Sequence, residues 1–130
     1  MKLILLGHVP GKKNLLRRSK NGGMFRDAAV AEQISKITYQ ARCQWKDREP
    51  LVRPAAKVLF HITDMRSDLD NKWTTVLDCL KDAGVIKNDN IKNGPRPVLY
   101  DWIESSDERV EVWLEGGLQQ LGLRAMGLGQ

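Results

Sequence analysis

Apolar and polar residues alternate with two different periods along the chain. Helical spacing of the apolar positions predicts a helix over 27–45 and a second one from about 69 to 83. Short apolar or alternating runs predict strands at 2–8, 55–63, 97–104 and 109–114. The expected fold class is α/β (α+β), a small mixed β-sheet packed with helices.

The same pattern predicts how these elements pack and connect. Each helix has one apolar stripe: Val30, Ile34, Ile37, Ala41 and Trp45 in the first, Leu69, Trp73, Val76, Leu77 and Leu80 in the second. Gly84 is placed to end the second helix in a left-handed turn. We expect a loop over 10–24, a short strand from 85, and a hairpin whose arms are 97–104 and 109–114.

The chain divides into a domain and a tail. With 130 residues it is long enough to bury one core, which we assign to 1–115. The tail, 116–130, is rich in Gly and Leu. Its glycines disfavour a stable helix, yet it is too apolar for a free linker, so we expect it to pack on the domain or on a partner chain.

Composition is that of an ordinary globular protein, with 42% hydrophobic and 28% charged residues. No apolar run approaches the roughly 18 residues that would cross a bilayer, so no membrane association is expected. Cys43 and Cys79 follow helical patterns and form neither a CxxC motif nor a zinc-type spacing. We interpret them as reduced core residues of a cytoplasmic protein.

Charge is distributed unevenly, although the net value is only +5. Residues 1–60 carry 13 Lys and Arg against 4 Asp and Glu, whereas 61–130 carry 8 against 12. Lys12, Lys13, Arg17 and Arg18 concentrate in the expected loop. A basic half beside an acidic half suits a protein that grips a polyanion in one part and acts on it in another. A solvated basic surface is the structural alternative.

The acidic half concentrates its aspartates in one helix and the turn after it: Asp68, Asp70, Asp78, Asp82 and Asp89. Carboxylates at this density repel one another unless a positive charge lies among them. Asp68 is placed to cap the helix and Asp70 to benefit from its dipole, which offers a purely structural explanation for two of them. An EF-hand is excluded, because the required Gly and Glu are missing from the loop positions counted from Asp68.

Chain geometry allows a metal site. The helix from Asp70 to its end spans roughly 20 Å, and an extended return from Gly84 to Asp89 spans about 17 Å. An antiparallel return would therefore bring Asp89 towards Asp68 and Asp70. Three hard oxygen ligands are typical of Mg²⁺, with Mn²⁺ as the alternative.

The motifs DLDN (68–71), LDCLKDAG (77–84) and NDN (88–90), behind GKKN (11–14), resemble the RusA family of Holliday junction resolvases over about 1–115. The resemblance implies a Mg²⁺-dependent endodeoxyribonuclease that resolves four-way junctions or other branched DNA in recombination and repair, as a homodimer. It assigns Asp68, Asp70 and Asp89 as the catalytic, metal-binding residues. The DNA-binding residues would be Lys12, Lys13, Asn14, Arg17 and Arg18, with Asn71, Lys72 and Asp78 as supporting residues.

Two positions depart from the family pattern. Thr74 stands where the family has a lysine, and Asn88 replaces the first of two acids in the turn. Lys72 lies about 200° round the helix from Asp70, so Lys12 or Lys13 would have to supply the missing charge. The alternatives are a branched-DNA-binding protein of the same fold with weakened catalysis, and an unrelated small metal-binding protein whose aspartates are helix caps.

Overall fold

The computed structural model describes residues 1–11, 16–18, 22–90 and 92–116. It is a small mixed α+β domain, a four-stranded mixed sheet packed with two helices, which confirms the expected fold class. The elements in chain order are β1 (Lys2–Leu6), β2 (Leu16–Arg18), β3 (Met24–Arg26), α1 (Ala28–Gln44), β4 (Ala55–Ile62), α2 (Leu69–Asp82), β5 (Val98–Glu104) and β6 (Arg109–Glu115).

The main sheet has the strand order β1-β6-β4-β5. Strand β4 pairs antiparallel with β6 and parallel with β5, and α2 forms the crossover between the two parallel strands. The predicted hairpin of 97–104 and 109–114 is therefore wrong, because β4 lies between its two arms. A four-residue link, 105–108, is short enough for a hairpin but also long enough to pass over one intervening strand, which is about 5 Å wide.

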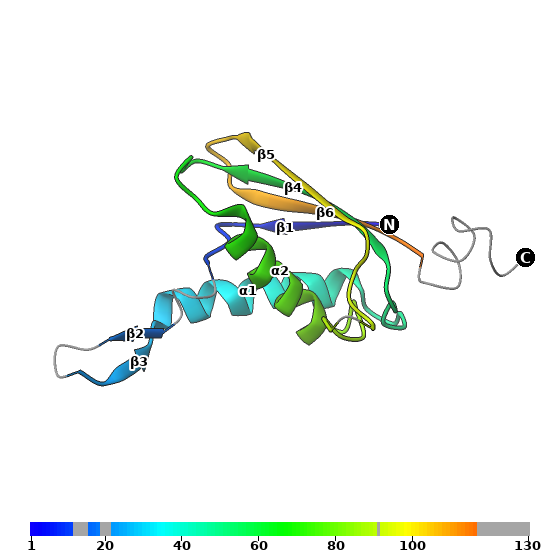
Figure 1. Ribbon diagram of the computed structural model, residues 1–130, viewed down its shortest axis with the longest axis horizontal. Coiled ribbons are helices and arrows are strands. Elements are labelled where there is room, and N and C mark those ends of the chain that lie inside the picture. Colours follow the sequence, from blue (N-terminus) through cyan, green and yellow to red (C-terminus); the bar gives the residue numbers. More distant parts are fainter. Residues whose placement is uncertain (12–15, 19–21, 91, 117–130) are drawn as a thin grey trace, which may run out of the picture.

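Both helices pack on the same face of the sheet (Figure 1). Buried residues alternate along β1 and β6 with period two, so Leu3, Leu5, Val110, Val112 and Leu114 all point to the helices. The predicted helix stripes are confirmed, with Ile37, Ala41, Val76 and Leu80 buried and Ile34, Leu69, Trp73 and Leu77 packed at the edge.

Helix α2 begins and ends where its sequence predicts. Asp68 caps it, with the side chain accepting a hydrogen bond from the amide of Asn71 at 3.3 Å. Gly84 follows the last turn with φ = +80°, a conformation that costs a residue with a Cβ about 1–2 kcal/mol. Ile86 then forms an isolated parallel bridge with Leu51.

The basic segment, which we define as residues 12–24, contains strand β2 and the start of β3 where the sequence predicted a loop over 10–24. Strands β2 and β3 pair antiparallel in a small separate sheet, which lies beyond the N-terminus of α1 and away from the main sheet (Figure 1). A three-residue strand contains too few alternations to register as a period, so the sequence pattern does not reveal it.

The cysteines correct one further expectation. Neither forms a disulfide, and Cys79 is buried as predicted, but Cys43 is exposed on α1 and is not a core residue. Among the described residues, none of the helices combines the length and the apolar character needed to cross a membrane.

Candidate metal and DNA-binding site

Asp68 faces a polar hollow of about 350 Å³ at the start of α2. The hollow is formed where the end of β1, the turn after β4 and the first turn of α2 meet; it is lined by His8, Gly11, Asp64, Arg66, Ser67, Asp68, Asn71 and Lys72. The Arg66 guanidinium donates hydrogen bonds to the Asp64 carboxylate and lowers its pKa. Asp68 is thus an exposed carboxylate that faces mixed charges.

Lys72 is the buried cation of this hollow, with only 4% of its surface exposed. Its Nζ donates a hydrogen bond of 2.6 Å to the carbonyl of Val9. Burial lowers the pKa of Lys72, and the nearby carboxylates of Glu108 and Asp64 partly oppose this. The ammonium therefore holds the end of the β1 segment against α2 and, as expected from helix geometry, does not lie beside Asp70.

A second buried hydrogen bond reinforces this attachment. Thr75, with 1% of its surface exposed, donates from Oγ to the carbonyl of Pro10 at 2.7 Å. Pro10 and Gly11 are themselves buried. The chain therefore enters the basic segment from a point that α2 fixes beside the Asp68 hollow.

The predicted DNA-binding residues follow this point directly. Lys12, Lys13 and Asn14 lie outside the described residues. Arg17 and Arg18 are in β2, where their backbones pair with Phe25 and Met24. The structure thus shows where the basic segment starts and that its strand β2 pairs antiparallel with β3.

Asp70 points to the other side of the helix start. Its carboxylate accepts a hydrogen bond from the hydroxyl of Tyr100 on β5. Its backbone carbonyl accepts one from the Thr74 hydroxyl at 3.0 Å, so the side chain that replaces the expected lysine is turned back onto its own helix. Sequence reasoning missed Tyr100, because the hairpin prediction did not place β5 beside α2.

Asp89 lies in the loop after Gly84 and is exposed. It lines a hollow of about 260 Å³ together with Trp73, Leu77, Asn90, Gly94, Pro95, Arg96 and Val98. Its own amide donates to the side-chain oxygen of Asn88 at 2.7 Å. The loop closes tightly at Gly94, where an added Cβ would lie only 2.8 Å from the carbonyl oxygen of Asn90.

Asp70 and Asp89 belong to the same side of α2. Trp73, which borders the Asp89 hollow, follows Asp70 by about one helical turn. Val98, from the same hollow, precedes Tyr100 by two strand positions, and these side chains share the helix-facing side of β5. The return from Gly84 thus brings Asp89 to a hollow that Trp73 and Leu77, in the second and third turns of the helix, also line.

The three predicted ligands are therefore not gathered at one point. Asp68 faces one hollow and Asp89 another, and Asp70 lines neither of them but accepts the hydrogen bond from Tyr100. In the described part of the chain, no three His, Cys, Asp or Glu side chains form a group that could hold a metal ion. Their chemistry suits Mg²⁺, but their arrangement here does not provide three ligands within 2.0–2.6 Å of a shared ion.

The two remaining supporting residues, Asn71 and Asp78, lie in different turns of α2. Asn71 lines the Asp68 hollow, and its carbonyl accepts a second hydrogen bond from Thr75 at 3.3 Å. Asp78 is half-buried in the third turn of α2, away from the helix start.

A histidine–carboxylate pair that sequence reasoning did not propose lies beside the Asp68 hollow. His8 and Glu108 are 2.6 Å apart, and Glu108 also accepts hydrogen bonds from the hydroxyl and amide of Thr63. Burial alone would raise the pKa of Glu108, but the hydrogen bonds from Thr63 and His8 outweigh it and lower the pKa. No sequence signal links these residues, which the β1–β6 and β4–β6 pairings bring together.

No protein-family model matches the chain, and no curated protein matches its sequence.

Proposed function

We propose that this protein is a Mg²⁺-dependent endodeoxyribonuclease that cuts branched DNA, above all four-way junctions. One structural observation carries the proposal: the basic segment starts beside the acidic end of α2, held there by Lys72 and Thr75. A phosphate backbone bound along the basic segment would run towards Asp68 and Asp70. The RusA-like motifs and the α+β fold support the same function.

The proposed ligands are Asp68, Asp70 and Asp89, with Mg²⁺, or alternatively Mn²⁺, as the ion. Joint coordination would require the Asp89 loop and the start of the helix to approach each other. Two features favour such a movement: all three side chains are exposed, and Asp89 lies in a loop rather than in a helix or strand.

DNA and a second copy of the chain are the proposed partners. Lys12, Lys13, Asn14, Arg17 and Arg18 would contact backbone phosphates, which fix position and carry no sequence information. Resolution of a junction requires two symmetric cuts, so we propose a homodimer with two active sites related by a twofold axis. Such a protein would act in the cytoplasm during recombination and repair.

The alternative is a branched-DNA-binding protein with weakened catalysis. Two contacts favour it: the Thr74 hydroxyl is bonded to the Asp70 carbonyl, where a lysine would bring a positive charge, and the Asn88 side chain is bonded within its own turn. A third explanation, aspartates that only stabilise the start of the helix, accounts for Asp68 as the cap and for Asp70 in the first turn, but not for Asp89.

Cleavage of a synthetic four-way junction distinguishes these functions. The wild type and Asp70→Asn are incubated with the junction and MgCl₂, and binding is measured in parallel without metal. Cleavage by the wild type that Asp70→Asn loses while it still binds the junction supports the nuclease. Asp82→Asn is the matched control, because it removes an exposed carboxylate from the opposite end of the same helix, and it should still cut. Junction binding without cleavage by the wild type supports the alternative, and the absence of binding refutes both DNA functions.

A further inference from the structure

The face of the sheet that points away from the helices has an unusual composition. Strand pairing places its side chains in three rows across β1, β6, β4 and β5. The rows are Lys2–Trp113–Lys57–Leu99, Ile4–Glu111–Leu59–Asp101 and Leu6–Arg109–His61–Ile103. Leu99 is 67% exposed and Leu6 58%, so large apolar side chains reach solvent at both edges of this open face.

Several of the polar residues among them already have a charged or aromatic partner. Glu111 lies 2.7 Å from Lys2 and 2.7 Å from His61, and Arg109 contacts Asp107 at 2.8 Å. Lys2 and Lys57 flank the ring of Trp113 at 5.0 and 5.7 Å from its centroid. Covering Lys2, Glu111 and His61 would thus bury charges that already have partners, which lowers the cost of desolvation.

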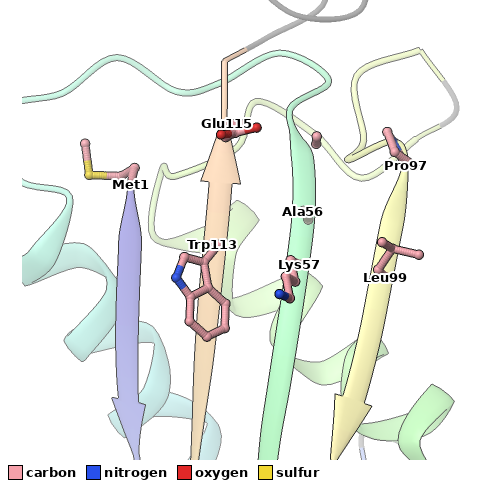
Figure 2. Close-up of a pocket in the computed structure, with 8 residues that line it drawn as sticks. Met1, Ala56, Lys57, Pro97, Leu99, Trp113 and Glu115 are labelled. Atoms are coloured by element: carbon pink, nitrogen blue, oxygen red, sulfur yellow. The ribbon is translucent and has the colours of Figure 1, made fainter.

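The open face is also hollowed. Two adjacent hollows, of about 340 and 410 Å³, share Lys57, Leu99 and Trp113. Figure 2 shows Trp113, Lys57 and Leu99 in a row across three strands, with Met1 beside β6 on one side. An apolar groove therefore crosses the sheet at the end where β6 finishes.

The C-terminal tail begins at this groove. Glu115, the last residue of β6, lines the same hollow, and Gly116 turns the chain with φ = +55°. The remaining 14 residues have five large apolar side chains, Leu118, Leu121, Leu123, Met126 and Leu128, and a single charged one, Arg124. Fully extended they span about 46 Å, whereas β5 is only about 10 Å from β6, so the tail can reach every row.

We propose that residues 117–130 cover the open face of the sheet of their own chain, with their leucines in the groove between Trp113 and Leu99. An apolar face and an apolar segment start at the same place, and each would otherwise expose surface that water disfavours. Arg124 can meet Asp101 or Glu115 at the rim. The proposal does not depend on nuclease activity.

Backbone relaxation of the ¹⁵N-labelled full chain tests this proposal. In the wild type we expect order parameters above about 0.7 for Leu121 and Leu123, and nuclear Overhauser contacts from their methyl groups to the Trp113 indole; a free tail would give values below about 0.6. Leu99→Asp should release the tail. Tyr39→Asp is the matched control, because Tyr39 is 65% exposed but lies on α1, and it should leave the tail ordered.

Three results would overturn the proposal. Low order parameters in the wild type would mean that the tail does not dock, and order that Leu99→Asp leaves unchanged would mean that it docks elsewhere. Order that rises with protein concentration, together with a doubled mass in sedimentation, would show that the occupant belongs to a second copy. Leu121→Asp with Leu123→Asp changes only the tail, so it tests the contact even if a substitution on the sheet disturbs folding.

Discussion

Replacing Thr75 with valine tests how α2 holds the start of the basic segment. Valine has the same shape as threonine but cannot donate a hydrogen bond, so Thr75→Val removes the 2.7 Å contact to the Pro10 carbonyl without leaving a cavity. Both residues are buried, so water cannot easily replace the lost donor.

An unsatisfied buried acceptor costs about 1–3 kcal/mol. The urea midpoint of unfolding should therefore fall by roughly 0.5–1.5 M, given a dependence of about 2 kcal/mol per M. The same change should weaken binding of four-way junction DNA, because the basic segment would lose one of its two hydrogen-bonded attachments to α2. Equilibrium unfolding followed by circular dichroism and a junction-binding titration at fixed salt measure the two effects.

Thr74→Val is the matched control, since it is the same substitution at the preceding position. Thr74 is exposed, and its hydroxyl donates to the Asp70 carbonyl in its own helix, so the effect of Thr74→Val on stability should stay within about 0.5 kcal/mol. If the two variants unfold at the same urea concentration, the attachment through Pro10 contributes nothing and this reasoning is refuted.

Three further predictions concern individual positions. Gly84→Ala should lower the free energy of unfolding by about 1–2 kcal/mol, measured by urea titration, because alanine is disfavoured at φ = +80°; an unchanged midpoint would contradict the left-handed turn. Gly94→Ala should push apart the loop that carries Asp89 and reduce junction cleavage more than it reduces junction binding, and equal effects on both would argue against a catalytic role for this loop. In the folded protein the pKa of Glu108 lies below its ordinary value of 4.5, so the unfolded chain binds more protons as the pH falls through this range. The free energy of unfolding should therefore decrease from about pH 4.5 downwards, until the pH is below the folded pKa. Unfolding curves recorded against pH should show a smaller loss over this window in Glu108→Gln, and identical pH profiles would refute the contribution of Glu108.

Local patterns in the sequence were sufficient to locate the large elements. The apolar stripes of α1 and α2, the cap at Asp68 and the left-handed turn at Gly84 all depend on neighbouring residues, and all are confirmed. The order of the strands depends on distant pairing. The alternation in β6 suits either partner, so the pattern alone did not reveal that β4 lies between β5 and β6.

In the candidate site, too, local features could be predicted from the sequence, whereas contacts between distant residues could not. The acidic cluster and the basic segment are visible in the sequence, but the contacts that join them are not. Nothing in the sequence links Lys72 to the Val9 carbonyl or Asp70 to the Tyr100 hydroxyl, since each pair meets only after the sheet has formed. The separation of Asp68 from Asp89 depends on where the loop after Gly84 turns, which chain length alone does not determine.

Cleavage of a four-way junction as a function of Mg²⁺ concentration is the most direct test of the proposed nuclease. The junction and a linear duplex of the same sequence are incubated with the wild-type protein, and the cut positions are mapped on all strands. From the proposed nuclease we expect paired cuts in opposite strands of the junction that require Mg²⁺, with little or no cleavage of the duplex. A junction that is bound but remains intact at every concentration of Mg²⁺ or Mn²⁺ would contradict it.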